Sequence, residues 1–332
     1  MEPIPRHWAA VRETHTFPGH GPFALTIHGS SDVSLEDARR DARRRMDALV
    51  AAGGPEQEHD SGQEYYPSRR LPEELLEEVR GEDGTLIAAI TRNRYGAAVL
   101  NTDALLISDI DLPQGSPGRA RSGAGRAGKR PGLLSRLFGG AKADAASEGS
   151  PSEAAADGAS DGDHDAADLP DELGGQGAGE RGRVHAELLT SIRDFGARHP
   201  ELGVRAYRTR NGFRLLVSGA DAHPASERAR ALMTEVRSDR LYMLLCRVHD
   251  TYRARLTPKP WRVDVAPFAS LPTRTATDAA HQDWVRRYRD ASAQVAVCRL
   301  LEVTGPAPSA EEQRIIDLHD RATRPESGLR LA

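Results

Sequence analysis

Two carboxylates stand one residue apart at the end of an apolar run, in the segment Leu105-Leu106-Ile107-Ser108-Asp109-Ile110-Asp111. Side chains two residues apart on a strand share a face, so Asp109 and Asp111 are expected to point the same way. Like charges at the end of a buried strand repel each other and resist desolvation, and a divalent cation removes both costs. The spacing therefore favours a Mg²⁺ or Mn²⁺ site for phosphate chemistry, and the alternative is a strand end whose acids simply face water.

A cation lies inside a second apolar strand pattern. Arg210-Asn211-Gly212 joins Val204–Thr209 to Phe213–Val217, and an Asn-Gly pair is a strong signal for a hairpin turn. Arg214 therefore lies within an apolar strand, where a buried cation needs an anionic partner. That partner is one of the two carboxylates, in a structural ion pair, or a ligand phosphate, which arginine binds with its forked geometry.

Basic and aromatic residues gather between Tyr252 and Asp264. This segment is the strongest candidate surface for contacts with phosphates or bases, and its two prolines favour an extended loop. The cations are Arg253, Arg255, Lys259 and Arg262. Asp264, at the end of the segment, is a candidate third carboxylate.

Two His-Asp pairs also occur, His249-Asp250 and His319-Asp320. Metal-dependent phosphohydrolases use such a pair together with further ligands on helices. No convincing set of companion ligands accompanies either pair, and the strand patterns in the middle of the chain argue against that class.

Local patterns predict the elements that position these residues. Ser34 is the expected N-cap of a helix that ends at Gly53-Gly54, and a short helix is expected from Leu71 to Val79. Three strands in close succession are expected to form an antiparallel meander, at Thr85–Ile90, Tyr95–Leu100 and Leu105–Asp111. Later helices are expected from Val184 to near Pro200, and from about 224 to 250, 283 to 291 and 309 to 322, with a strand at 295–303.

A low-complexity stretch interrupts these patterns. Residues 113–183 are rich in Gly, Ala, Ser and acids, a composition that cannot bury enough apolar surface to offset its ordering entropy. The sequence therefore predicts one α+β domain, mainly an antiparallel sheet flanked by helices. Residues 1–112 are expected to form its N-terminal part and residues 184–332 the remainder, with 113–183 as a long disordered insertion.

Charge is distributed unevenly along the chain. The formal net charge is −4, from 45 Lys and Arg against 49 Asp and Glu. Residues 143–180 hold eleven of the acids and no Lys or Arg, which leaves 38 acids against 45 basic residues elsewhere. A basic body suits a polyanionic partner, although an Arg-rich surface also arises from compositional bias alone.

Composition also predicts the compartment. No apolar run is long enough to span a bilayer, and the N-terminal residues lack the apolar core of a signal peptide. Cys246 and Cys298 are the only cysteines, are far apart in the chain, and are expected to be buried thiols in a reducing environment. A cytoplasmic protein without a membrane span is expected.

The order of these segments resembles the catalytic core of archaeo-eukaryotic-type primases and primase-polymerases. That family has a strand with two acids one residue apart, a later strand with a basic residue after a glycine, and a third acid. The matching positions are Ile107–Asp111, Asn211–Leu216 and Val263-Asp264, and Arg214 stands where the family usually has histidine. The resemblance spans about residues 85–265.

The resemblance implies a metal-dependent nucleotidyltransferase that acts on DNA or RNA with nucleoside triphosphates. Asp109, Asp111 and Asp264 would hold two Mg²⁺ or Mn²⁺ ions, and Arg214 would bind a phosphate of the nucleotide. The four cations of the 252–264 segment would contact the template or the triphosphate. One alternative is a non-catalytic protein that binds nucleic acid or nucleotides on the same scaffold, and another is a metal-dependent sugar or phosphate enzyme.

Overall fold

The structure is a computed structural model that describes residues 1–17, 22–54, 72–112, 176–268 and 279–332. The described residues within 1–54, 72–112 and 184–332 belong to one compact unit. Most of the predicted insertion at 113–183 lies outside the described residues. Among the residues that are described, no helix combines the length and the apolar character that a bilayer crossing requires.

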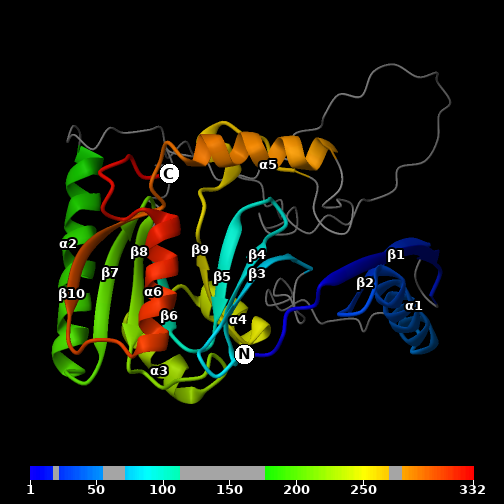
Figure 1. The fold of residues 1–332 in the computed structure, drawn as a ribbon, viewed down its shortest axis with the longest axis horizontal. Coiled ribbons are helices and arrows are strands. Elements are labelled where there is room, and N and C mark those ends of the chain that lie inside the picture. The colour runs from blue at the N-terminus through cyan, green and yellow to red at the C-terminus, as the bar shows by residue number, and fades with distance from the viewer. Residues whose placement is uncertain (18–21, 55–71, 113–175, 269–278) are drawn as a thin grey trace, which may run out of the picture. The chain divides into compact units, whose positions relative to one another are not determined.

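The strand with the acid pair belongs to a four-stranded antiparallel sheet, called the β8 sheet here, with the order β10-β7-β8-β6 (Figure 1). Its strands are β6 (Leu106–Asp111), β7 (Gly203–Thr209), β8 (Gly212–Ser218) and β10 (Cys298–Thr304). The predicted hairpin of β7 and β8 is confirmed, with Thr209 opposite Gly212. Helix α2 (Gln176–Arg198) covers the face that carries Phe213, through a ring contact with His185, and α6 (Ala310–Thr323) covers the face that carries Arg214.

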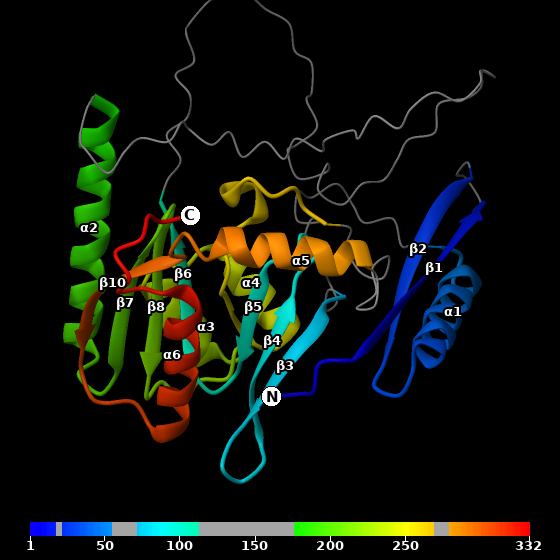
Figure 2. The same ribbon diagram turned by 45° about the horizontal axis from the view of Figure 1, so that its top comes forward.

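A second antiparallel sheet, called the β4 sheet here, has the order β3-β4-β5-β9 (Figure 2). Its strands are β3 (Glu74–Arg80), β4 (Leu86–Arg92), β5 (Ala98–Thr102) and β9 (Tyr252–Arg255). The meander prediction is correct for β4 and β5 and wrong for the third strand, because β6 pairs with β8 and β9 takes the place beside β5.

The predicted helix from Leu71 to Val79 is also wrong. From Glu74 on, this segment is strand β3, which pairs with β4. Two glutamates of this segment form ion pairs with arginines of other strands. Glu74 forms an ion pair with Arg92 of β4, and the preceding Glu73 forms one with Arg253 of β9.

Four more helices in the described part of the chain pack on two apolar clusters. They are α3 (Glu227–Glu235), α4 (Arg240–His249), α5 (Ala279–Ser292) and a short 3₁₀ helix, η2 (Pro260–Val263). Helices α3 and α4 pack on the main core, and α5 and η2 pack on a smaller cluster around Trp284. One buried apolar cluster includes Leu100 of the β4 sheet, Leu215 of the β8 sheet and Ile316 of α6, so the two sheets share a core. The predicted helix over 224–250 is interrupted, because Arg237 adopts a positive φ of 60° and Asp239 starts a new helix as its N-cap.

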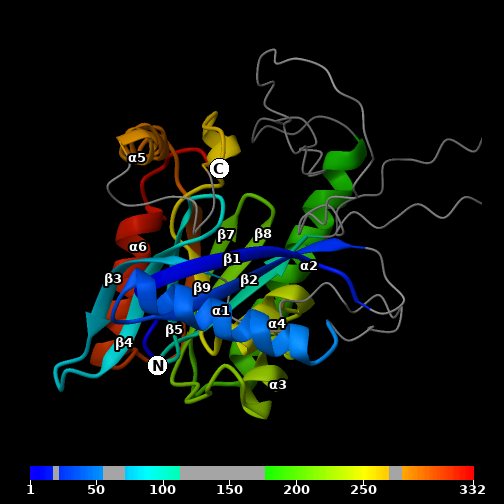
Figure 3. The ribbon, with the colours of Figure 1, turned by 90° about the vertical axis from the view of Figure 1, so that its right-hand side faces the viewer.

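The N-terminal elements are β1 (His7–His15), β2 (Phe23–Ser31) and α1 (Leu35–Ala51) (Figure 3). The two strands pair with each other and α1 packs against them. The Ser34 cap is confirmed, since its side chain accepts from the backbone N–H of Asp37. Strand β2 and helix α1 approach each other closely at Gly29, where a Cβ would lie 2.2 Å from the backbone nitrogen of Ala42.

Gly212 allows β6 to approach β8, and this closeness gives a testable prediction. A Cβ at this position would lie 1.9 Å from the carbonyl oxygen of Ile110. Because a backbone atom cannot move aside as a flexible side chain does, Gly212→Ala should lower the free energy of unfolding by about 1–3 kcal/mol. Urea unfolding followed by circular dichroism measures this change.

The matched control is Gly182→Ala in α2, where a Cβ would meet nothing within 4 Å. Alanine has a higher helix propensity than glycine, so this variant should be unchanged or more stable by up to about 1 kcal/mol. Equal stability of the two variants would contradict the close approach of β6 and β8.

Candidate functional site

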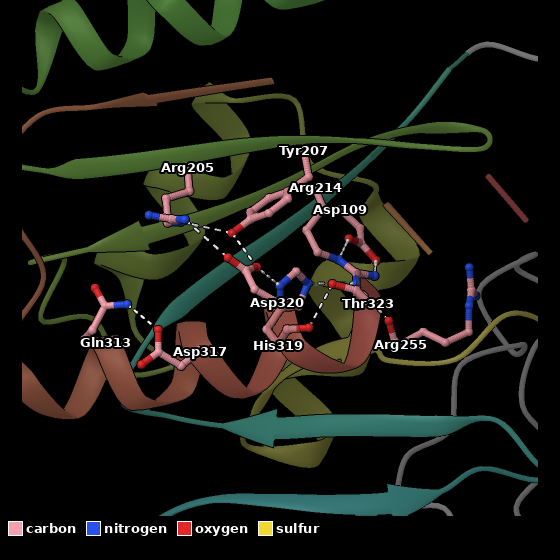
Figure 4. A network of polar contacts seen from close by, with 10 residues as sticks. All are labelled: Asp109, Arg205, Tyr207, Arg214, Arg255, Gln313, Asp317, His319, Asp320 and Thr323. Carbon is pink, nitrogen blue, oxygen red and sulfur yellow. Dashed lines mark hydrogen bonds and ion pairs between the residues drawn. The ribbon is translucent and has the colours of Figure 1, made fainter. Parts of the chain in front are cut away.

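Arg214 and Asp109 form a bidentate ion pair between neighbouring strands (Figure 4). They face each other in the register of β6 and β8, and Arg214 donates from Nε to Oδ1 at 2.8 Å and from Nη2 to Oδ2 at 3.1 Å. Arg214 is 1% exposed, whereas the side chain of Asp109 is 31% exposed. The anionic partner expected for Arg214 is therefore Asp109, and both oxygens of that carboxylate accept from the guanidinium.

The same guanidinium reaches two further elements. Its Nη1 donates to the carbonyl oxygen of Arg255 at 2.9 Å and lies 3.4 Å from Nε2 of His319. These contacts use four of the five N–H donors of an arginine. Burial alone lowers the pKa of Arg214, but attraction to Asp109 outweighs this effect and raises the pKa above its ordinary value. Arg214 therefore stays charged and joins β6, β8, the end of β9 and α6.

His319 continues this network on α6. Its Nδ1 lies 2.8 Å from Asp320, which also accepts from the hydroxyl of Tyr207 at 2.8 Å and from Arg205 at 3.2 Å. Burial lowers the pKa of His319, so the imidazole is neutral near pH 7. Asp320 then accepts from Nδ1–H, and Nε2 accepts from Arg214. Burial raises the pKa of Asp320, but its hydrogen bonds to His319 and Tyr207 outweigh that effect and lower it.

Asp111 lies at the exposed end of β6, opposite Gly212. Desolvation raises the pKa of its carboxyl, and the negative charges of Asp239 and Asp109 raise it further, while Arg255 and Lys259 act in the opposite direction. Asp239 was not singled out in the sequence. It caps α4 by accepting from the backbone N–H of Tyr242 at 2.7 Å, and its own N–H donates to the carbonyl oxygen of Asp109 at 2.8 Å.

Asp264 ends η2 in a left-handed conformation, with φ 58°, and is exposed. Among the residues that the structure describes, no group of three His, Cys, Asp or Glu side chains is arranged to hold a metal ion. Asp109 already gives both carboxylate oxygens to Arg214. The residues present in this arrangement therefore do not fit a metal site built from Asp109, Asp111 and Asp264.

Two of the four cations predicted at the phosphate-binding surface are directed elsewhere. Arg253 forms an ion pair with the buried Glu73 at 2.7 Å and also donates to Asn101 at 2.8 Å. The same guanidinium lies 3.0 Å from Nδ1 of His249. Arg262 is 8% exposed, within η2.

The other two cations, Arg255 and Lys259, are half-buried, and Lys259 lies over an aromatic ring. Nζ of Lys259 lies 5.2 Å from the ring centre of Trp261, and the ring of Trp261 meets that of Tyr95 edge to face at 5.3 Å. The positive charges of Arg255 and Lys259 both oppose the rise in the pKa of Asp111 at the end of β6. These four residues, Arg255, Lys259, Trp261 and Tyr95, are called the cation–aromatic surface below.

Other elements hold the backbone of this surface in place. The N–H of Leu256 donates to the carbonyl oxygen of Ala98, and Thr257 Oγ1 accepts from the N–H of Ala98, both at 2.8 Å. On α5, the hydroxyl of Tyr288 donates to the carbonyl oxygen of Pro258. The chain that carries Lys259 and Trp261 is therefore anchored to β5 and to α5 as it leaves β9.

Comparisons with protein-family models, with curated proteins and with solved structures found no match for this chain. The interpretation of the site therefore depends on its residues and their geometry.

The Arg214–Asp109 pair gives a prediction about stability. Arg214→Ala removes the cation that joins four elements, and Asp109→Asn leaves a buried guanidinium without its counter-charge. Each change should lower the free energy of unfolding by about 3–5 kcal/mol. In the double variant the loss should be smaller than the sum of the two, because neither charge is left unpaired. Urea unfolding of all four proteins gives the coupling energy.

Asp111→Asn is the matched control, because it alters the second carboxylate of the same strand. A raised pKa means that the folded protein favours the neutral form of this carboxyl. The variant should therefore equal or exceed the native protein in stability at pH 7. The difference should vanish as the pH falls below the ordinary aspartate pKa of about 3.9. A large loss in this control would show that both acids carry the structural role.

Proposed function

We propose that this protein binds nucleic acid or nucleotides at the cation–aromatic surface, in the manner of a binding protein rather than an enzyme. The observation that carries the proposal is the contact of Lys259 with Trp261 and of Trp261 with Tyr95. Every base presents a π-face, so half-buried aromatic rings beside cations suit bases and phosphates together.

Three further features support this chemical class of ligand. The backbone of the surface is held by β5 and α5, so little ordering is required on binding. Outside residues 143–180, basic residues outnumber acids by 45 to 38, which favours the approach of a polyanion. The resemblance to primases and primase-polymerases implies the same class of ligand.

Arg214 has a supporting role in this proposal. The phosphate contact predicted for it would require the guanidinium to leave Asp109, Arg255 and His319. A fully buried guanidinium with these acceptors stabilises the scaffold, and the ligand contacts fall to Arg255 and Lys259 at the surface.

Metal-dependent nucleotidyl transfer is the second candidate, and one observation favours it. Asp111, Asp109 and Asp239 gather enough negative charge to raise the pKa of Asp111, and a bound cation would relieve that repulsion. The binding role is preferred because Asp109 is already neutralised by Arg214.

Substitutions in the surface test the binding proposal. Lys259→Ala should weaken binding of a short fluorescent single-stranded oligonucleotide. It should also reduce the slope of log K against log salt by about 0.7, which is the change expected for one lost phosphate contact. Trp261→Ala should cost about 1–3 kcal/mol of binding free energy, through lost stacking, with a smaller change in slope. Fluorescence anisotropy at several salt concentrations measures both quantities.

Arg230→Gln is the matched control. Arg230 is an exposed cation on α3, paired with Glu227. Its replacement removes a positive charge from another part of the chain and should leave both affinity and salt slope near the native values. An equal loss for Arg230→Gln and Lys259→Ala would mean that binding follows total charge and not this surface.

Calorimetry with Mn²⁺ separates the two candidate functions. A binding protein should take up nucleoside triphosphate to a similar extent with and without Mn²⁺, and Asp111→Asn should bind at least as well as the native protein because a repelling charge is gone. Nucleotide binding that requires Mn²⁺ and is lost in Asp111→Asn would instead favour the nucleotidyltransferase.

A further inference from the structure

We propose that His319 on α6 is a positioning residue for the cation–aromatic surface, acting through Arg214 and the carbonyl group of Arg255. This inference rests on the proposed function of that surface. His319 lies more than fifty positions from Lys259 in the sequence and does not belong to the surface itself. Two contacts link His319 to this surface: Nε2 of His319 lies 3.4 Å from Nη1 of Arg214, and the same Nη1 donates to the carbonyl oxygen of Arg255 at 2.9 Å (Figure 4). Both Arg214 and His319 are buried.

The first step of the argument concerns the point where the chain leaves β9. Arg255 is the last residue of that strand, and its carbonyl oxygen accepts from Arg214 at 2.9 Å. In Figure 4 the side chain of Arg255 extends away from the Arg214 guanidinium. The hydrogen bond from Arg214 therefore fixes the backbone of Arg255, while the side chain of Arg255 does not take part in this contact. Any shift of Arg214 moves the carbonyl that starts the loop carrying Lys259 and Trp261.

The second step concerns the orientation of Arg214. Asp109 holds one edge of the guanidinium through Nε and Nη2, and this contact leaves Nη1 to be shared between Arg255 and His319. Nη1 carries two N–H groups, one for each acceptor. If His319 did not accept, one of these N–H groups would be buried without a partner. Such a donor costs free energy, so the Arg214 side chain would be expected to shift toward another acceptor.

The third step concerns His319, which is fixed on both sides. Its Nδ1 lies 2.8 Å from Asp320, and its ring meets the ring of Tyr207 edge to face at 5.0 Å. Its side chain is fully buried. These contacts set the tautomer and the ring plane, so that the Nε2 lone pair points to Arg214. Asp320 is held in turn by Tyr207 and Arg205 of β7.

The test is His319→Phe, which keeps a ring but removes both nitrogen atoms. We expect oligonucleotide affinity to fall by about threefold to tenfold, the range typical of residues that act at a distance. The salt slope should keep its native value because no surface cation is lost. Hydrogen–deuterium exchange of the segment 256–264 should become faster. His319→Gln, whose amide oxygen can take the place of Nε2, should restore affinity and protection toward native values.

Thr323→Val is the matched control for damage to α6. Thr323 is buried on the same helix and donates to the carbonyl oxygen of His319 at 2.8 Å, and within the described part of the chain it forms no hydrogen bond with Arg214. This variant should lose some thermal stability and keep native affinity and native exchange in the segment 256–264. All assays are run well below the melting temperature of the least stable variant.

The outcomes separate the two proposals. If the native protein binds no oligonucleotide, or if Lys259→Ala and Trp261→Ala leave binding unchanged, the proposed function is overturned and this inference falls with it. If those two variants weaken binding but His319→Phe changes neither affinity nor exchange, the positioning role is overturned and the proposed function stands. Equal effects of His319→Phe and Thr323→Val would also overturn the positioning role, since α6 would then act only through stability.

Discussion

The buried guanidinium of Arg214 is the constraint on which the rest of this structure depends. A cation is stable in the protein interior only when a counter-charge and hydrogen-bond acceptors surround it. Without them, its desolvation penalty exceeds the free energy gained by burying the side chain. Asp109, the carbonyl of Arg255 and Nε2 of His319 supply those acceptors, and each comes from a different element. Strand β6, the end of β9 and helix α6 must therefore all converge on β8.

This arrangement changes what the acid pair can do. A carboxylate whose two oxygens accept from an arginine is a counter-ion, and a metal ion would have to displace that arginine. Asp111 has no such arginine partner among the residues that the structure describes. It is exposed at the strand end, and the charges of Asp109 and Asp239 raise its pKa. Two acids on the same face of one strand thus have different roles. On the neighbouring strand β8, the residue opposite Asp109 is Arg214, whereas the residue opposite Asp111 is Gly212, which has no side chain.

The cations of the 252–264 segment also have different surroundings, depending on where each lies relative to strand β9. Strand β9 lies beside β5, with Arg253 opposite Asn101, and this register directs Arg253 toward the buried Glu73. Two residues later the strand ends, and Arg255 and Lys259 lie half-buried near Asp111. Arg253 and Arg255 are two residues apart and share a face of β9, so alternation does not separate them. The end of the strand at Arg255 separates Arg253, which pairs with Glu73, from the two cations that act on the charge of Asp111, although the sequence presents all of them as one basic cluster.

Local signals in the sequence determined much of the secondary structure. The Asn-Gly pair indicated the β7–β8 hairpin, Ser34 indicated the start of α1, and the isolated cation at Arg214 indicated an anionic partner, because each of these depends on neighbouring residues or on the chemistry of one side chain. Tertiary structure decided which strands pair. It placed β9 beside β5, it moved β6 to the other sheet, and it made a strand of the glutamate-rich segment before residue 80 by bringing Arg92 and Arg253 to its acids. It also brought His319 and Asp320 to Arg214 from more than a hundred residues away. No local pattern encodes such contacts, because their free energy comes from burial and charge pairing that exist only once the chain has folded.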